Sequence, residues 1–61
     1  MTTVTKVTYE VVILELQTMR VTDGIGPTFD QEETAARFLQ QSQQLIVGCE
    51  YKIRKTTVEF I

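Results

Sequence analysis

The longest pattern in the sequence is an alternation of polar and apolar residues over positions 3–21, TVTKVTYEVVILELQTMRV. The segment is rich in Val, Ile, Thr and Tyr and contains no Gly or Pro, which is typical of a β-strand. Its apolar residues change face in mid-strand. The odd-numbered face carries Val7, Tyr9, Val11 and Ile13 before the polar Glu15 and Gln17, and the even-numbered face carries Val12, Leu14 and Leu16.

A β-bulge near Ile13 would explain this change of face, because one extra residue reverses the direction of every later side chain. A bulge would also suit a strand that is unusually long for a small domain. It would leave Met19 and Val21 pointing outward. The alternative for residues 9–20 is a helix, since Glu, Leu, Gln and Met are good helix formers, but the β-branched residues favour a strand.

Residues 22–29, TDGIGPTF, contain the signals that end this strand. Asp23 and Gly24 are typical of a turn, and Pro27 has no amide hydrogen to donate to a sheet. A short strand over 25–29 would therefore be confined to a sheet edge. The path of this segment decides whether the first and last strands run parallel or antiparallel, and the pattern leaves both open.

The spacing of apolar residues predicts a helix over about 31–47. Asp30 is a good N-cap residue, Glu33 stands in the capping-box position, and Gly48 suits the left-handed residue that follows a helix. One largely apolar stripe consists of Ala35, Phe38, Leu39, Ser42, Leu45 and Ile46. We expect this stripe to cover one face of a sheet.

The final segment, CEYKIRKTTVEFI, alternates again and predicts a strand over 49–61. Because its link to the helix is short, helix and strand should be antiparallel neighbours. Residues 1–61 are therefore expected to form a single small α+β domain. Its two- to three-stranded sheet carries one helix packed on one face.

Size and composition limit how such a domain can be stabilised. The chain has 61 residues, 43% of them hydrophobic, and a net charge of −2. Domains below roughly 70 to 80 residues usually add a disulfide, a metal or a second subunit to their core. The single cysteine, Cys49, cannot form an internal disulfide, and a chain without histidine lacks an ordinary zinc ligand set. Oligomerisation is therefore expected.

A soluble, cytoplasmic protein without membrane contact is expected, because no apolar run reaches the roughly 18 residues of a membrane span. The first residues, MTTVTKVTYE, also lack the charged-then-apolar order of a signal peptide.

The two glycines before the helix raise the question of a nucleotide site. A dinucleotide-binding loop requires a third glycine where this chain has Phe29, and a Walker loop requires a lysine, which is absent between Lys6 and Lys52. The carboxylates around the helix start would repel phosphate, and they belong to Asp23, Asp30, Glu32 and Glu33. The loop is interpreted as a turn and a helix cap, and its acidic residues as a surface that suits a basic partner.

Those carboxylates match no calcium-binding loop, and capping and the helix dipole already account for them, so no metal site is predicted. Catalysis is not expected either. Cys49 has no histidine to generate its thiolate, and so short a chain encloses little volume around carboxylate pairs. Cys49 is interpreted as a small buried residue, and no cofactor is predicted.

A second candidate site lies in the last strand and consists of Tyr51, Lys52, Arg54 and Lys55. An aromatic ring among basic residues is an arrangement that binds single-stranded nucleic acid. However, Glu50 and Glu59 flank the cluster. Glu10 can pair with one of the bases across the sheet, joined by Glu15 if the bulge exists. A solvated face of paired charges is therefore the favoured interpretation.

A single helix covers one face of a sheet, and the mainly apolar odd-numbered face is the better candidate. The even-numbered apolar residues would then lie uncovered, and they are Val12, Leu14, Leu16, Val58 and Phe60. An exposed apolar patch typically marks a protein interface, which predicts a homodimer whose sheets pack through this face or join edge to edge. Alternatively, the bulge turns Leu14 and Leu16 into the core and the C-terminal end frays.

These features lead to a functional hypothesis of a small, acidic, non-enzymatic interaction protein. It would be a homodimer that inhibits or regulates a macromolecular partner, as many phage and mobile-element proteins do. The alternative is a ligand-sequestering or nucleic-acid-binding module, in which the basic C-terminal strand meets a phosphate-bearing ligand.

Overall fold

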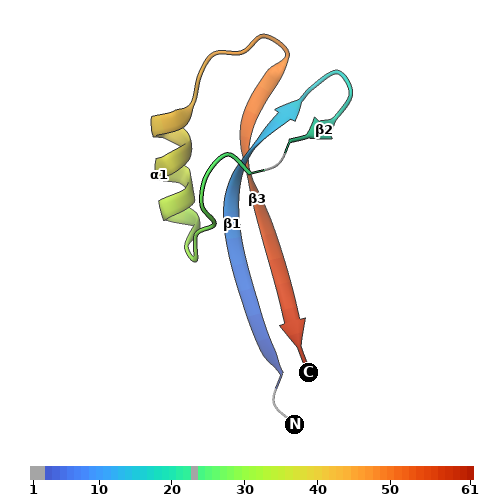
Figure 1. Cartoon of the computed structure of the whole chain (residues 1–61), viewed down its shortest axis with the longest axis vertical. Coiled ribbons are helices and arrows are strands. Elements are labelled where there is room, and N and C mark those ends of the chain that lie inside the picture. Colours follow the sequence, from blue (N-terminus) through green and yellow to red (C-terminus); the bar gives the residue numbers. More distant parts are fainter. Residues whose placement is uncertain (1–2, 23) are drawn as a thin grey trace.

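The computed structural model describes residues 3–22 and 24–61 and contains a three-stranded antiparallel sheet with one helix (Figure 1). The strands are β1 (Val4–Glu15), β2 (Arg20–Val21) and β3 (Cys49–Phe60), in the order β2-β1-β3, and the helix α1 spans Glu32–Ser42. The predicted α+β fold is confirmed. The first and last long strands run antiparallel, an orientation that the sequence pattern had left open.

Strands β1 and β3 pair along their whole length, from Val4 opposite Phe60 to Glu15 opposite Cys49, in one unbroken register. Ile13 lies directly opposite Tyr51 within this register. The bulge predicted near Ile13 is therefore wrong for the β1–β3 ladder. The Val, Ile and Thr residues of both strands account for the long pairing, because β-branched side chains fit a pleated surface.

The predicted strand over 3–21 ends early, at Glu15. Residues 16–19 form a loop, and Arg20 pairs back with Glu15 to close a short hairpin between β1 and β2. Within this loop Met19 adopts a positive φ of 58°. The helical alternative for residues 9–20 is also wrong. Because no Gly or Pro marks this loop, the sequence pattern did not reveal it.

After β2 the chain continues along the same edge of β1. The Thr22 amide donates to the Ile13 carbonyl at 3.0 Å, and the Thr22 hydroxyl oxygen accepts a hydrogen bond from the Ile13 amide at 3.2 Å. The Thr22 hydroxyl thus accepts the hydrogen bond that a main-chain carbonyl would accept in a regular sheet. The backbone after Thr22 can therefore leave the edge of β1. The chain returns at Phe29, which exchanges two hydrogen bonds with Tyr9 at 2.7 and 2.8 Å.

The extra residues that the change of face suggested for β1 lie instead in the chain that pairs with its other edge, between β2 and Phe29. From Leu14 to Tyr9, β1 takes five steps, whereas the chain opposite takes eight steps between their partners Val21 and Phe29. The predicted edge strand over 25–29 is represented by the single bridge at Phe29. Pro27 precedes this bridge, in agreement with its missing amide hydrogen.

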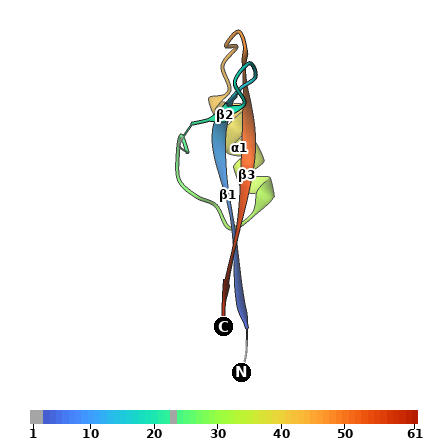
Figure 2. The same cartoon turned by 90° about the vertical axis from the view of Figure 1, so that its right-hand side faces the viewer.

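Helix α1 covers the odd-numbered face of the sheet, as predicted. Phe29 is the cross-strand partner of Tyr9, so both side chains point to that face, and the Phe29 ring lies 5.5 Å from the ring of Phe38 in α1. In β3, Tyr51 and Ile53 are half-buried, whereas their even-numbered neighbours are exposed. Figure 2 shows α1 on one side of the sheet only.

Both predicted ends of the helix need correction. The N-cap residue is Gln31, without a side-chain capping hydrogen bond, so Asp30 lies one residue before the cap. The helix ends at Ser42 because Gln43 has an extended backbone, with φ −62° and ψ 131°. The last turn contains no basic residue, so no positive charge stabilises the C-terminal end of the helix dipole.

The segment after the helix changes the roles of three residues. Leu45 and Ile46 do not extend the apolar stripe of α1; Leu45 is fully exposed and Ile46 is 38% exposed. Gly48 has the expected positive φ, 81°, but it belongs to the turn that leads into β3. In that turn the Cys49 amide donates to the Ile46 carbonyl at 3.2 Å.

The core is small and the molecule is long. Within the described residues the buried side chains are Val11, Val12 and Ala35. The molecule measures 49 × 25 × 13 Å, and its radius of gyration is 13.6 Å. A compact domain of this length would have a radius of gyration of roughly 10 to 11 Å. Much of the sheet therefore lies outside the core.

Replacing Val11 with Ala should test this small core. Val11 is 1% exposed, and removing its two methyl groups should lower the free energy of unfolding by about 2 kcal/mol, measured by urea unfolding. Val47→Ala deletes the same atoms from a side chain that is 97% exposed and should change stability by less than about 0.5 kcal/mol. Equal losses in the two variants would contradict the assigned core.

Gly48→Ala should lower the free energy of unfolding by about 1 kcal/mol, because an L-residue is strained at the φ of 81°. Apart from Gly48 and its two chain neighbours, no heavy atom lies within 4 Å of the position that its Cβ would occupy, so the backbone alone causes the loss. Gly48→Asn should cost less, since Asn tolerates the left-handed region. An alanine variant as stable as the wild type in thermal unfolding would contradict this turn geometry.

Candidate interaction surfaces

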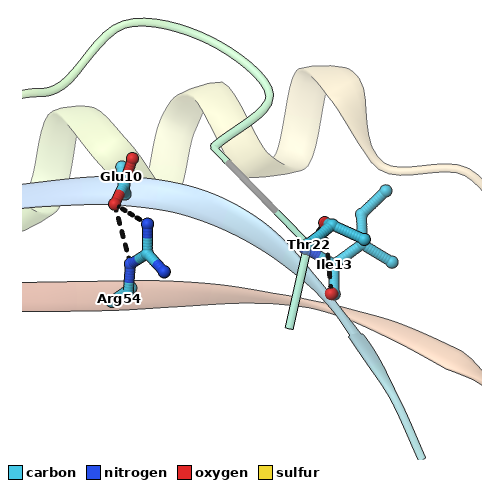
Figure 3. Close-up of polar contacts among 4 residues, drawn as sticks. All are labelled: Glu10, Ile13, Thr22 and Arg54. Carbon is cyan, nitrogen blue, oxygen red and sulfur yellow. Dashed lines mark hydrogen bonds and ion pairs between the residues drawn. The ribbon is translucent and has the colours of Figure 1, made fainter. Parts of the chain in front are cut away.

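The face of the sheet opposite α1, called here the open face, carries paired charges at its centre. Glu10 and Arg54 are cross-strand partners, and Arg54 Nε donates to Glu10 Oε1 at 2.7 Å (Figure 3). Arg54 Nη2 donates to the same oxygen. On the same face Lys52 Nζ lies 3.2 Å from Glu50 Oε2. The expected pairing of Glu10 across the sheet is thus present.

Two glycines let the loop between β2 and α1 pack closely. A Cβ at Gly24 would collide with the Glu10 carboxylate, and a Cβ at Gly26 would collide with the Phe38 ring. Both glycines therefore have a packing role. Gly24 brings the chain against the open face, and Gly26 brings it against the helix.

Val12 differs from the expectation for the open face. It was predicted to lie uncovered, yet it is 3% exposed. The chain after β2 lies beside it, since Thr22 bonds to Ile13 and Ile25 bonds to Val11, and Gly24 packs on Glu10 nearby. The remaining predicted residues are less covered: Leu14 is half-buried, Leu16 is 44% exposed, Val58 is 41% exposed and Phe60 is 56% exposed.

A two-stranded ribbon extends beyond the helix and ends at the two chain termini (Figures 1 and 2). It is formed by Val4–Thr8 of β1 and Thr56–Phe60 of β3. Val4 lies opposite Phe60 and is 57% exposed. With Val58 they form an apolar group on the open face. The charged pairs of Glu10 and Lys52 separate this group from Leu14 and Leu16.

The basic cluster of β3 does not form one surface. Because side chains alternate, Tyr51 and Lys55 point to the helix side, whereas Lys52 and Arg54 point to the open face. Lys52 and Arg54 each contact a carboxylate, and Tyr51 is half-buried. This arrangement offers less support to the nucleic-acid alternative than a single basic face would.

The acidic residues at the helix start are exposed, and they are Asp30, Glu32 and Glu33. Glu33 Oε1 lies 3.8 Å from Arg37 Nη2 one turn later. Asp23 lies outside the described residues. Among residues 3–22 and 24–61, no group of three or more Cys, Asp or Glu side chains is placed to hold a metal ion.

An open cleft of about 680 Å³ lies between the segment after α1 and the start of β3. It is lined by Leu16, Gln43, Gln44, Leu45, Ile46, Cys49, Glu50, Tyr51 and Lys52. Cys49 is a half-buried free thiol. The cleft was not predicted from sequence, because Leu45 and Ile46 fit a longer helix equally well.

The helix of the described chain is too short to cross a membrane. Comparison of the chain with protein-family models, with curated proteins and with solved structures gives no match.

The ion pair of Glu10 and Arg54 should contribute a coupling energy of about 0.5 to 1 kcal/mol to folding. The exposed fractions of its side chains are 18% and 45%, so water screens the pair in part. A double-mutant cycle of Glu10→Gln and Arg54→Gln in urea unfolding measures this energy, which should fall at high salt.

The matched control is the pair of Lys52 and Glu50, whose side chains are 55% and 50% exposed. Its coupling energy should be smaller, below about 0.5 kcal/mol. A larger coupling for the control pair would contradict the role assigned to Glu10.

Proposed function

We propose that this chain is a non-enzymatic interaction protein that works as a homodimer and regulates or inhibits a macromolecular partner. The observation that carries the proposal is the mismatch in length between helix and sheet. Helix α1 has 11 residues and spans about 16 Å, whereas β1 and β3 have 12 residues each and span about 40 Å. The helix therefore covers less than half of the length of the β1–β3 pair and leaves the ribbon uncovered.

The uncovered part is poorly suited to stand alone in water. A two-stranded β-ribbon without a covering layer is marginally stable. The ribbon beyond the helix nevertheless exposes Val4, Val58 and Phe60, and its two strands are paired as far as Val4 and Phe60. A second subunit would supply the missing contacts, which is a common solution for domains with a core this small.

A dimer built in this way leaves other surfaces for a partner. The outer face of α1 and the cleft beside the start of β3 lie in the half of the molecule that α1 covers, outside the ribbon. Binding through such a surface requires no catalytic group, which suits a regulator or an inhibitor. Dimerisation would present two copies of this surface and so increase avidity.

Light scattering coupled to size-exclusion chromatography should give twice the chain mass of 7.0 kDa at micromolar concentrations. The mass should decrease toward 7.0 kDa on dilution, with a concentration-dependent thermal unfolding midpoint. A well-folded species of 7.0 kDa at all concentrations, with an unfolding midpoint that does not change, would contradict the homodimer.

The regulatory part of the proposal is tested by affinity capture from lysate of the source cell. The wild-type chain should retain a defined macromolecule in a stoichiometric amount, and addition of free chain should compete for it. If titration calorimetry with the purified candidate shows no binding, the capture was nonspecific and this part of the proposal fails.

A further inference from the structure

We propose that two copies join through the outer edge of β3, antiparallel and centred on Thr57, so that two three-stranded sheets become one six-stranded sheet. This inference rests on the proposed homodimer and names its interface. Such an edge-to-edge contact is isologous, because a two-fold axis through Thr57 places Thr57 opposite its own copy and gives both copies the same set of contacts.

The direction of the backbone groups shows which edge is free. The Leu16 amide donates to the Gly48 carbonyl at 2.8 Å, in line with the even-numbered register of β1 and β3. Hydrogen-bonded pairs alternate along an antiparallel ladder, so even-numbered residues of β3 bond to β1. The amides and carbonyls of Lys55, Thr57 and Glu59 therefore point away from β1, toward the outer edge of the described sheet.

This edge is longer than any other that the described chain offers. Strand β3 is an outer strand over all of its 12 residues. The opposite edge of β1 is already occupied by β2, Thr22, Ile25 and Phe29, down to Tyr9. Only the part of β1 before Tyr9 remains there. Long unpaired edges readily pair with a second strand, so β3 is the favoured site for a second copy.

The open face is a less suitable interface. Packing two open faces together would bury the Glu10–Arg54 pair and the Lys52–Glu50 pair at the centre of the contact. Desolvation of such pairs opposes association. Edge pairing leaves both pairs in contact with water. It also gives Val58 and Phe60 of each ribbon cross-strand neighbours on the open face, the partner's Thr56 and the partner's Arg54.

The register centred on Thr57 is supported by charge complementarity. It places Lys55 opposite the partner's Glu59, and the two-fold axis repeats this pair. On the open face, Arg54 lies opposite the partner's Phe60, where a guanidinium can stack on the ring. On the helix side, Ile53 lies opposite the partner's Ile61. Thr57 lies opposite itself, with no charge at the axis.

Other registers are less favourable. An axis at Lys55 places this lysine opposite its own copy, and an axis at Ile53 places Lys52 opposite the partner's Arg54. An axis at Thr56 places Ile53 opposite the partner's Glu59 and leaves Lys55 without an acidic partner. Like charges directly opposite each other destabilise strand pairing.

The position of the helix is compatible with this contact. In Figure 1, α1 lies beside the first half of β3. By the bounds of β3, Cys49–Phe60, Thr57 belongs to the second half, on the ribbon. The antiparallel arrangement would place the helix of each copy at opposite ends of the joined ribbons. The two helices therefore do not meet.

Charge reversal tests the register. Lys55→Glu or Glu59→Lys alone places two like-charged pairs across the axis and should raise the dimer dissociation constant about tenfold or more in analytical ultracentrifugation. The double variant Lys55→Glu with Glu59→Lys restores both pairs and should return the constant to within about threefold of wild type.

The matched control is Lys6→Glu, which makes the same change in net charge on the same ribbon but on β1. It should change the dissociation constant by less than about threefold. If the control weakens the dimer as much as Lys55→Glu does, or if the double variant fails to recover, the Thr57 register is overturned.

Amide hydrogen exchange tests the edge independently of any variant. In the dimer, the amides of Lys55, Thr57 and Glu59 should be protected, and dilution to the monomer should remove that protection. The amides of Thr56 and Val58 bond to β1 within one copy and serve as the internal reference. Fast exchange at Lys55, Thr57 and Glu59 in a confirmed dimer would overturn the edge contact.

The two proposals fail in different ways. A wild-type chain that stays monomeric contradicts the homodimer, and the edge contact with it. The other failure is a wild-type dimer in which the outward amides of β3 exchange fast and the charge reversals do not change the dissociation constant. That result agrees with the homodimer and contradicts only the β3 edge.

Discussion

The structure depends on the pairing of β1 with β3, which is far longer than the helix that covers it. Each residue of a strand advances about 3.3 Å, whereas each residue of a helix advances 1.5 Å. Two strands of 12 residues and one helix of 11 therefore cannot match in length. The chain forms a covered sheet at one end and a bare ribbon at the other, which explains its small core and elongated shape.

The covered end is held by contacts on both sides of β1. Val11 faces the helix side and Val12 faces the open side, yet both are buried. The helix covers the first, and the chain after β2 passes beside the second, where Gly24 packs on Glu10. The loop that initially suggested a phosphate site thus acts as a second, thin layer of the fold. Its glycines permit close approach to a carboxylate and to an aromatic ring.

Part of the candidate surface could be predicted from the sequence. Alternation assigned Val58 and Phe60 to the face opposite the helix, and charge patterning suggested that Glu10 would pair across the sheet. The pattern did not reveal the loop over 16–19, because its residues are equally suited to a strand, and Met19 adopts a positive φ without being Gly or Asn. It also did not reveal the cover over Val12, which depends on a nonlocal return of the chain.

The sequence by itself determined the two long strands, the existence of the helix and the face of the sheet that it covers, since these follow from local alternation and helical spacing. Only the tertiary structure decided where β1 ends, where the helix stops and that the chain after β2 covers Val12. Those features depend on hydrogen bonds between residues far apart in the chain, such as Leu16 with Gly48 and Tyr9 with Phe29. Local sequence preference at these positions is too weak to select one partner, so the long-range contacts select it.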